Sequence, residues 1–255
     1  VRAEYQYSDF ANQIDAMQWQ NVYTNGQPGA TYDAWDRSVS VFGVRPLSPD
    51  NRYHNVTGMF GANLPKDSRF TATAAYGMLE QNQSLLPYSY NNDQLAMQTL
   101  PRSSAGAAID TLNFVADYTI TPVPKVNLRA YFRNYDLNND TPSSNWQYVT
   151  QDTSNLDGTV AYVNKRVSLP YEWDRRNIGV DATWRLPART SLLVGIERES
   201  VGREYREADT AENIFRATLR TRGARWATVE ARVLFGARDG GDYNNTITKE
   251  SYWYA

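Results

Sequence analysis

Cysteine is absent from this 255-residue chain, and histidine occurs only once. Without cysteine the chain can form neither a disulfide framework nor a thiolate metal site. It also cannot attach a c-type haem covalently, because that linkage needs a Cys-x-x-Cys-His motif. The single histidine, His54, has no serine or carboxylate at a readable spacing and so makes no catalytic triad. We therefore predict no catalytic, cofactor-binding or metal-binding residues.

Long apolar runs and an excess of one charge are also missing. Mean hydropathy is −0.63, and no stretch approaches the roughly 18 apolar residues that a transmembrane helix needs, which excludes a helical membrane protein. A transmembrane β-barrel is not excluded, because its strands need only about 9–11 residues and half of those face a polar lumen. With 26 basic and 28 acidic residues, the chain lacks the basic footprint of a nucleic-acid binder.

What the chain does have is strict alternation of apolar and polar residues, clearest over residues 111–120 and 125–133. A period of two places the two sets on opposite faces of a pleated strand. The short proline turn between the two runs predicts an antiparallel hairpin. One face is continuously apolar and aromatic, whereas the other carries Arg, Lys, Asn and Asp. This pattern suits a sheet with lipid on one side and water on the other.

Hairpins of the same design recur along the chain. Short turns are predicted at 64–68, 121–124, 186–189 and 222–225, and long polar segments at 79–109 and 137–171 lie on the other side. Short periplasmic turns and long extracellular loops are typical of outer-membrane barrels. Nine spanning strands are predicted, near residues 1–9, 52–63, 69–79, 110–120, 125–136, 173–185, 190–204, 210–221 and 226–237.

Trp35–Val44 is a doubtful tenth spanning strand. Counting it as spanning would place the short turn PLSPDN on the side of the long loops. We therefore prefer to interpret Phe10–Asn51 as one external loop with room for a small hairpin.

A soluble β-sandwich is the main structural alternative, since it too has one apolar and one polar face. Loops of about 30 residues are long for a compact soluble domain, which favours the membrane barrel. Aromatic residues near strand ends also favour it, because such residues form interfacial girdles in membrane barrels. These aromatics are Tyr5, Tyr7, Tyr76, Tyr118, Trp184 and Phe235.

Several segments resemble the MtrB/PioB family of outer-membrane barrels, which are associated with decahaem cytochromes. They include YSDFAN (Tyr7–Asn12), the PDN–His–LP–Tyr-Gly–Gln order within Pro49–Asn82, LLPY (Leu85–Tyr88) and the stretches 112–142 and 171–213. Together these segments cover most of the chain. The resemblance implies a large barrel in the bacterial outer membrane that ensheathes a periplasmic multihaem cytochrome and lets it pass electrons across that membrane.

The resemblance also implies what the chain itself supplies. We expect a non-enzymatic barrel wall that binds no cofactor, with haem c carried by a decahaem cytochrome in the lumen. An extracellular cytochrome and outer-membrane lipid are further expected partners. A barrel of nine or ten strands is filled by its own side chains. We therefore expect an all-β chain that forms one segment over residues 1–255, the C-terminal part of a larger antiparallel transmembrane β-barrel.

The polar side chains of the predicted lumen face are the candidate partner contacts. Arginine suits carboxylates and haem propionates because its planar fork bonds them bidentately. The alternative is that these charges pair across strands and stabilise the wall. The candidates are Lys125, Asn127, Arg129, Arg133, Asp117, Asp181, Arg185, Arg216, Arg220, Glu230 and Arg232.

Two other polar motifs are interpreted as structural. His54 lies beside a proline turn, and we expect it to form hydrogen bonds on the turn side. DLNND (Asp136–Asp140) imitates the start of a calcium loop but has Thr141 and Gln147 where such a loop needs Gly and Glu. It is interpreted as a solvated loop.

Three functions remain open on the sequence. The first is a sheath around a cytochrome. The second is a general porin that conducts solutes, in which the arginine rows would select anions. The third, an outer-membrane enzyme, is disfavoured because no catalytic set is present.

Overall fold

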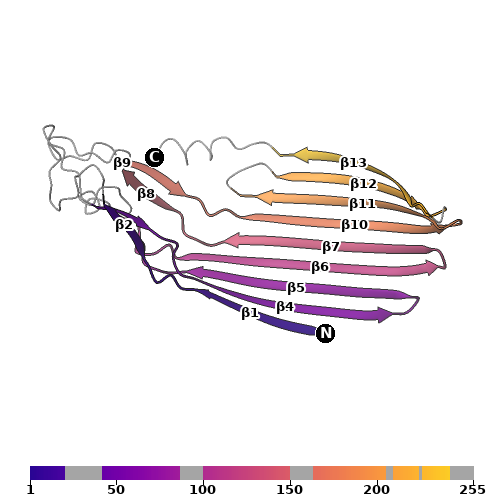
Figure 1. The fold of residues 1–255 in the computed structure, drawn as a ribbon, viewed down its shortest axis with the longest axis horizontal. Helices are drawn as coiled ribbons and strands as arrows, with labels where there is room; N and C mark the ends of the chain where they lie inside the picture. Colours follow the sequence, from indigo (N-terminus) through magenta and orange to yellow (C-terminus); the bar gives the residue numbers. More distant parts are fainter. Residues whose placement is uncertain (21–41, 87–99, 150–162, 205–208, 224–225, 242–255) are drawn as a thin grey trace.

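Nine long strands form one antiparallel sheet in the computed structural model, which describes residues 1–20, 42–86, 100–149, 163–204, 209–223 and 226–241. Figure 1 shows these strands side by side. In spatial order they are β1 (Arg2–Phe10), β4 (Asn51–Leu64), β5 (Ser68–Gln81), β6 (Ala107–Val123), β7 (Val126–Asn139), β10 (Trp173–Leu186), β11 (Thr190–Arg203), β12 (Thr210–Thr221) and β13 (Val229–Gly240). No helix long and apolar enough to cross a membrane occurs in these residues.

Two small hairpins stand apart from the sheet. β2 (Ala16–Gln20) pairs with β3 (Phe42–Pro46), and β8 (Ser144–Val149) pairs with β9 (Val163–Ser168). Both lie at the end of the sheet opposite the short turns (Figure 1). We call these two ends the loop end and the turn end. The described part of the doubtful segment Trp35–Val44 belongs to β3 and not to the sheet; its residues 35–41 lie outside the described residues.

The strand bounds differ from the sequence prediction mainly where pairing continues past the alternating run. β6 begins at Ala107 and β7 ends at Asn139, and the two pair from Ile109↔Asn139 onward. The predicted solvated loop Asp136–Asp140 is therefore mostly strand, because residues 136–139 pair with β6 and Asp136 and Leu137 also pair with β10. At the other end of the sheet, β13 starts at Val229 and not at residue 226. Its pairing with β12 begins only at Thr221↔Val229.

The register gives every strand two unlike faces. On β10, Asn177 and Asp181 are buried among neighbouring side chains, whereas Ile178 and Val180 on the other face are 59% and 46% exposed. Residues paired across antiparallel strands share a face, so the register extends this division over the whole sheet. We call the face of Asn177 the polar face and that of Ile178 the apolar face.

Two of the short turns have the same backbone conformation. Lys66 and Asp67 have φ values of 62° and 49°, and Ala188 and Arg189 have 55° and 54°. Two consecutive left-handed residues define a type I′ turn, whose twist matches that of the flanking strands. Each pair follows a Leu-Pro dipeptide. The turns therefore fix tight antiparallel hairpins at the turn end.

Candidate functional site

Arg216 on β12 is the centre of a hydrogen-bonded cluster on the polar face. Its Nη2 atom donates to Asp181 Oδ1 and to Tyr131 Oη, both at 2.7 Å, and its Nη1 donates to Glu197 Oε2 at 3.1 Å. Tyr131 Oη also donates to Glu197 Oε2 at 2.5 Å. We call Tyr131, Asp181, Glu197 and Arg216 the Arg216 cluster. One guanidinium thus ties β12 to β7, β10 and β11.

The cluster continues toward the loop end along β10 and β11. Asn177 Nδ2 donates to Glu197 Oε1 at 2.7 Å and to Glu199 Oε2 at 2.9 Å. Arg175 Nε donates to the same Glu199 oxygen at 3.0 Å. The Glu197 and Glu199 carboxylates on β11 therefore accept their hydrogen bonds from side chains of the sheet itself.

Glycines on the neighbouring strands make room for this cluster. Gly179 pairs with Tyr131, and a Cβ atom at Gly179 would collide with the tyrosine ring and hydroxyl. Gly195 pairs with both Asp181 and Arg216, and a Cβ there would collide with the Asp181 carboxylate. Glycine within a strand often marks a close approach of other groups. Here the missing Cβ atoms let the Tyr131 ring lie against Gly179 and the Asp181 carboxylate lie against Gly195.

Tyr131 is the most enclosed apolar side chain in the described part of the chain, with 5% of its surface exposed. The guanidinium carbons of Arg129, Arg133 and Arg216 lie 5.0, 5.4 and 5.7 Å from its ring centroid. Cations at this distance from an aromatic ring are attracted to its electron-rich face. The ring therefore helps to hold three positive charges within a small area of the polar face.

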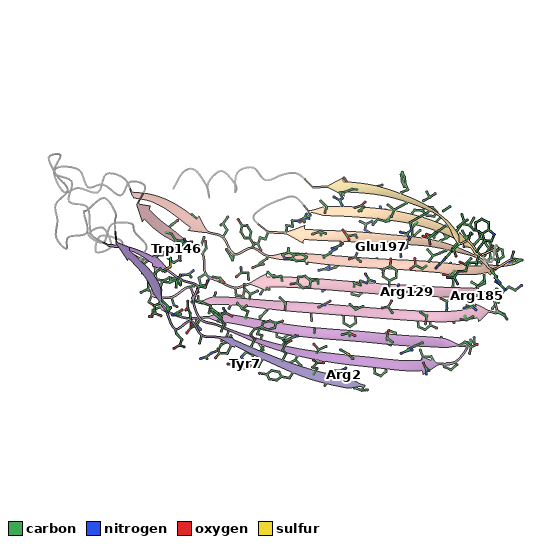
Figure 2. All side chains as sticks on the ribbon, in the orientation of Figure 1. Arg2, Tyr7, Arg129, Trp146, Arg185 and Glu197 are labelled. Atoms are coloured by element: carbon green, nitrogen blue, oxygen red, sulfur yellow. The ribbon has the colours of Figure 1, made fainter. Side chains whose placement is uncertain are left out.

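The sequence-predicted lumen residues share one side of the sheet. Figure 2 shows Arg185 near the turn end, with Arg129 and Glu197 farther toward the loop end. By register the polar face holds Asp117, Asn127, Arg129, Arg133, Asp181, Arg185, Arg216, Arg220, Glu230 and Arg232, and Lys125 lies in the turn before β7. Their role as partner contacts stays a prediction.

The basic residues among these candidates fall into two groups. Arg129 pairs with Asp117, Arg216 with Asp181 and Glu197, and Arg232 with Glu230. The others make no ion pair within the described residues. We call them the unpaired basic set: Lys125, Arg133, Arg185 and Arg220. Cross-strand pairing therefore accounts for only part of the positive charge on the polar face.

The sequence prediction for His54 needs correction. His54 lies inside β4 on the apolar face, where its Nδ1 is 2.8 Å from Tyr5 Oη. Its ring centroid lies 6.2 Å from that of Tyr5 and 5.0 Å from that of Tyr7. The partner is therefore a tyrosine on the adjacent strand and not the proline turn, because β4 already begins at Asn51.

The proline turn instead belongs to a polar cluster at the loop end. Asp50 Oδ1 accepts a hydrogen bond from the Asn12 backbone nitrogen at 2.6 Å, and the Asp50 nitrogen donates to Gln83 Oε1 at 2.7 Å. Gln83 Nε2 in turn donates to Asp15 Oδ1 at 3.0 Å. These contacts join the chain after β1, before β4 and after β5.

A second loop-end contact holds two carboxyl groups together. The Glu204 nitrogen donates to the Glu172 carbonyl oxygen at 3.0 Å. Burial, followed by a hydrogen bond to the Glu204 side chain, raises the pKa of Glu172 above its usual value. Within the described residues no group of three His, Asp or Glu could hold a metal ion.

The apolar face carries every aromatic residue predicted for the girdles. Tyr5, Tyr7 and Tyr76 lie toward the loop end, and Tyr118 and Trp184 lie toward the turn end. Phe235 on β13 shares this face through its pairing with Phe215. Amphipathic rings at both ends of an apolar band are typical of a transmembrane barrel wall.

A family model described as "Putative outer membrane beta-barrel porin, MtrB/PioB" matches residues 1–252. No curated protein matches the chain. The matched residues include all nine strands of the sheet and both small hairpins.

Proposed function

Since the chain belongs to the MtrB/PioB family of outer-membrane β-barrel porins, we propose that it forms part of a wide barrel wall that holds a periplasmic multihaem cytochrome. The polar face would contact the cytochrome and the apolar face would contact outer-membrane lipid. The haem groups belong to the partner, because this chain has no cysteine to attach them. The chain would position and insulate an electron carrier without carrying electrons itself.

The unpaired basic set is the observation that carries this proposal. A wall that only needed to stabilise itself would pair its charges across strands, as Arg129 and Arg216 do. Cations without carboxylate partners can instead form bidentate bonds with carboxylates or haem propionates of a protein in the lumen. Three of them, Lys125, Arg185 and Arg220, lie near the turn end, the periplasmic side in outer-membrane barrels.

The sheet also supports a wide barrel. Within the described residues β1 and β13 each pair with one neighbour only, so the nine strands form an open wall. A closed barrel of that size would be filled by its own side chains. A lumen that holds a folded cytochrome therefore requires further strands at these edges.

We expect the complex to survive purification in mild detergent, with a haem-staining partner bound to the chain. Replacing Arg133, Arg185 and Arg220 together with glutamine should lower the retained haem about tenfold. Three lost charge contacts of roughly 0.5 kcal/mol each give a factor of that size. The measurement is the ratio of haem absorbance to the amount of this chain that remains after washing.

A triple variant with the same loss of charge provides the control. Arg45, Arg52 and Arg176 lie outside the polar face, and their replacement with glutamine should leave the retained haem unchanged. Equal losses in both triple variants would mean that net charge, and not the polar face, governs retention. Absence of a haem partner in the wild-type preparation would contradict the proposal.

A general anion-conducting porin is the second candidate function, because the same unpaired cations would attract small anions. Conductance in a planar bilayer separates the two functions. An empty lumen that selects anions, in a preparation without a haem partner, would favour the porin.

A further inference from the structure

An apolar groove of about 490 Å³ crosses strands β10 to β13 on the apolar face. It is a feature of the lipid side of the sheet, so it plays no part in holding a partner in the lumen. Its apolar walls are Ile178, Val180, Ile196, Phe215, Phe235 and Ala237. Several of these side chains are well exposed, and Ile196 reaches 62%. With this volume and an apolar lining, the groove has room for part of an acyl chain.

A basic residue stands at the loop-end edge of this groove. Arg198 lines it, and in the register its neighbours are Ile178 on β10 and Asn213 on β12. The Arg198 side chain is exposed and makes no ion pair or hydrogen bond within the described ranges. The groove is therefore lined mainly by apolar side chains and has one basic residue, Arg198, at its loop-end edge.

The position of Arg198 along β11 matches the depth of lipid headgroups. Leu192, Val194 and Ile196 form the apolar row that precedes it, and the strand begins at Thr190. Eight residues at about 3.3 Å each, on a strand tilted by about 40°, raise the Arg198 backbone roughly 20 Å above the turn end. Its long side chain can extend from there to the edge of the roughly 25 Å apolar band. An arginine at that level lies where headgroup phosphates would meet it.

We propose that this groove binds one anionic lipid of the loop-end leaflet, with its phosphate on Arg198 and an acyl chain over Ile178, Ile196, Phe215 and Phe235. Burying apolar chain against these side chains favours binding. A charge-assisted bond between guanidinium and phosphate adds specificity for an anionic headgroup. Asn213 beside Arg198 supplies a further donor. The proposal needs only that the apolar face lies in a membrane, and it does not depend on which partner occupies the lumen.

Native mass spectrometry of the full chain released from nanodiscs tests this site. The nanodiscs contain phosphatidylcholine with a minor fraction of phosphatidylglycerol. The wild-type chain should retain one phosphatidylglycerol in preference to phosphatidylcholine. Arg198→Gln should lower that preference about tenfold, the change expected for loss of one charge-assisted bond worth roughly 1.4 kcal/mol.

Arg52→Gln is the matched control. Arg52 lies on the same face at the same end of the sheet and does not line the groove. It is exposed, as is Asp9, with which it forms an ion pair, and an exposed pair of this kind contributes little. The Arg52→Gln variant should retain the lipid as the wild type does. Ala237→Leu, which narrows the groove while leaving Arg198 in place, should also reduce retention.

Three results would overturn the proposal. The first is an equal effect of Arg198→Gln and Arg52→Gln on lipid retention. The second is no effect of Arg198→Gln or of Ala237→Leu. The third is retention of both lipids in proportion to their abundance in the nanodisc. The last result would mean that only annular lipid contacts this face.

Discussion

Arg216→Gln is expected to lower the free energy of unfolding by about 2–4 kcal/mol, the largest effect of a single charge removal on the polar face. The change leaves Asp181 and Glu197 without their cation. Their side chains are only 10% and 15% exposed, so water replaces the lost bonds incompletely. It also removes one of the guanidinium groups beside Tyr131. Breaking an enclosed ion pair from one side is costly because the remaining charges stay poorly solvated.

Urea-induced unfolding in detergent micelles, followed by tryptophan fluorescence, measures this loss. Arg238→Gln is the matched control, because Arg238 pairs with Glu212 on the same face at 2.7 Å but is itself 65% exposed. Exposed pairs contribute at most about 1 kcal/mol. Arg216→Lys should recover only part of the loss, since lysine cannot bond Asp181 and Glu197 with a planar fork. Similar losses for Arg216→Gln and Arg238→Gln would contradict the role assigned to the cluster.

Gly179→Ala is expected to destabilise the sheet by about 1–3 kcal/mol, which is typical of overpacking. The added methyl group collides with the ring and hydroxyl of Tyr131. That ring cannot move without breaking its bonds to Glu197 and Arg216. The sign of this stability change is informative. When nothing obstructs the methyl group, Gly→Ala inside a strand stabilises by roughly 0.5–1 kcal/mol.

Gly58→Ala provides that comparison. Gly58 lies in the middle of β4 on the apolar face, and a Cβ atom there has no other atom within 4 Å. This variant should be neutral or slightly stabilised in the same urea titration. In a Tyr131→Leu background, Gly179→Ala should lose most of its effect because the obstruction is gone. A loss that persists in that background would show that Tyr131 is not the cause.

The nine-stranded architecture follows from the sequence because two signals agree. Period-two alternation, as in Thr111–Ile120, shows which face of the sheet each residue occupies. The order of short turns and long loops shows which end of each strand lies at the turn end and which at the loop end. Neither signal marks where pairing stops. Asp136 and Asn138 continue β7 because β6 offers each of them a backbone partner, and β10 also pairs with Asp136, whatever the polarity of the side chains.

The polar face is predictable from the sequence, but its contacts are not. Tyr131 and Arg216 are 85 residues apart, and their contact depends on the register between strands joined through a long loop. The alternation places Arg216, Tyr131 and Glu197 in polar rows, and it suggests that Glu197 can interleave with the arginines, but it does not show that these three side chains meet. A useful signal would have been a tyrosine within a polar row facing a glycine, as Tyr131 faces Gly179. That signal becomes readable only once the register is known.

The division of the sheet into a lipid-facing side and a water-facing side can be tested directly on β7. Because the chain has no native cysteine, single spin labels can be attached at Asn127, Ala130, Phe132 and Arg133 on β7 in lipid nanodiscs. Collision rates with oxygen, which concentrates in lipid, and with a water-soluble nickel chelate report the surroundings of each label. Labels at positions 130 and 132 should favour oxygen, whereas labels at 127 and 133 should favour nickel. Nickel access at all four positions, or no difference between the two pairs, would contradict the account.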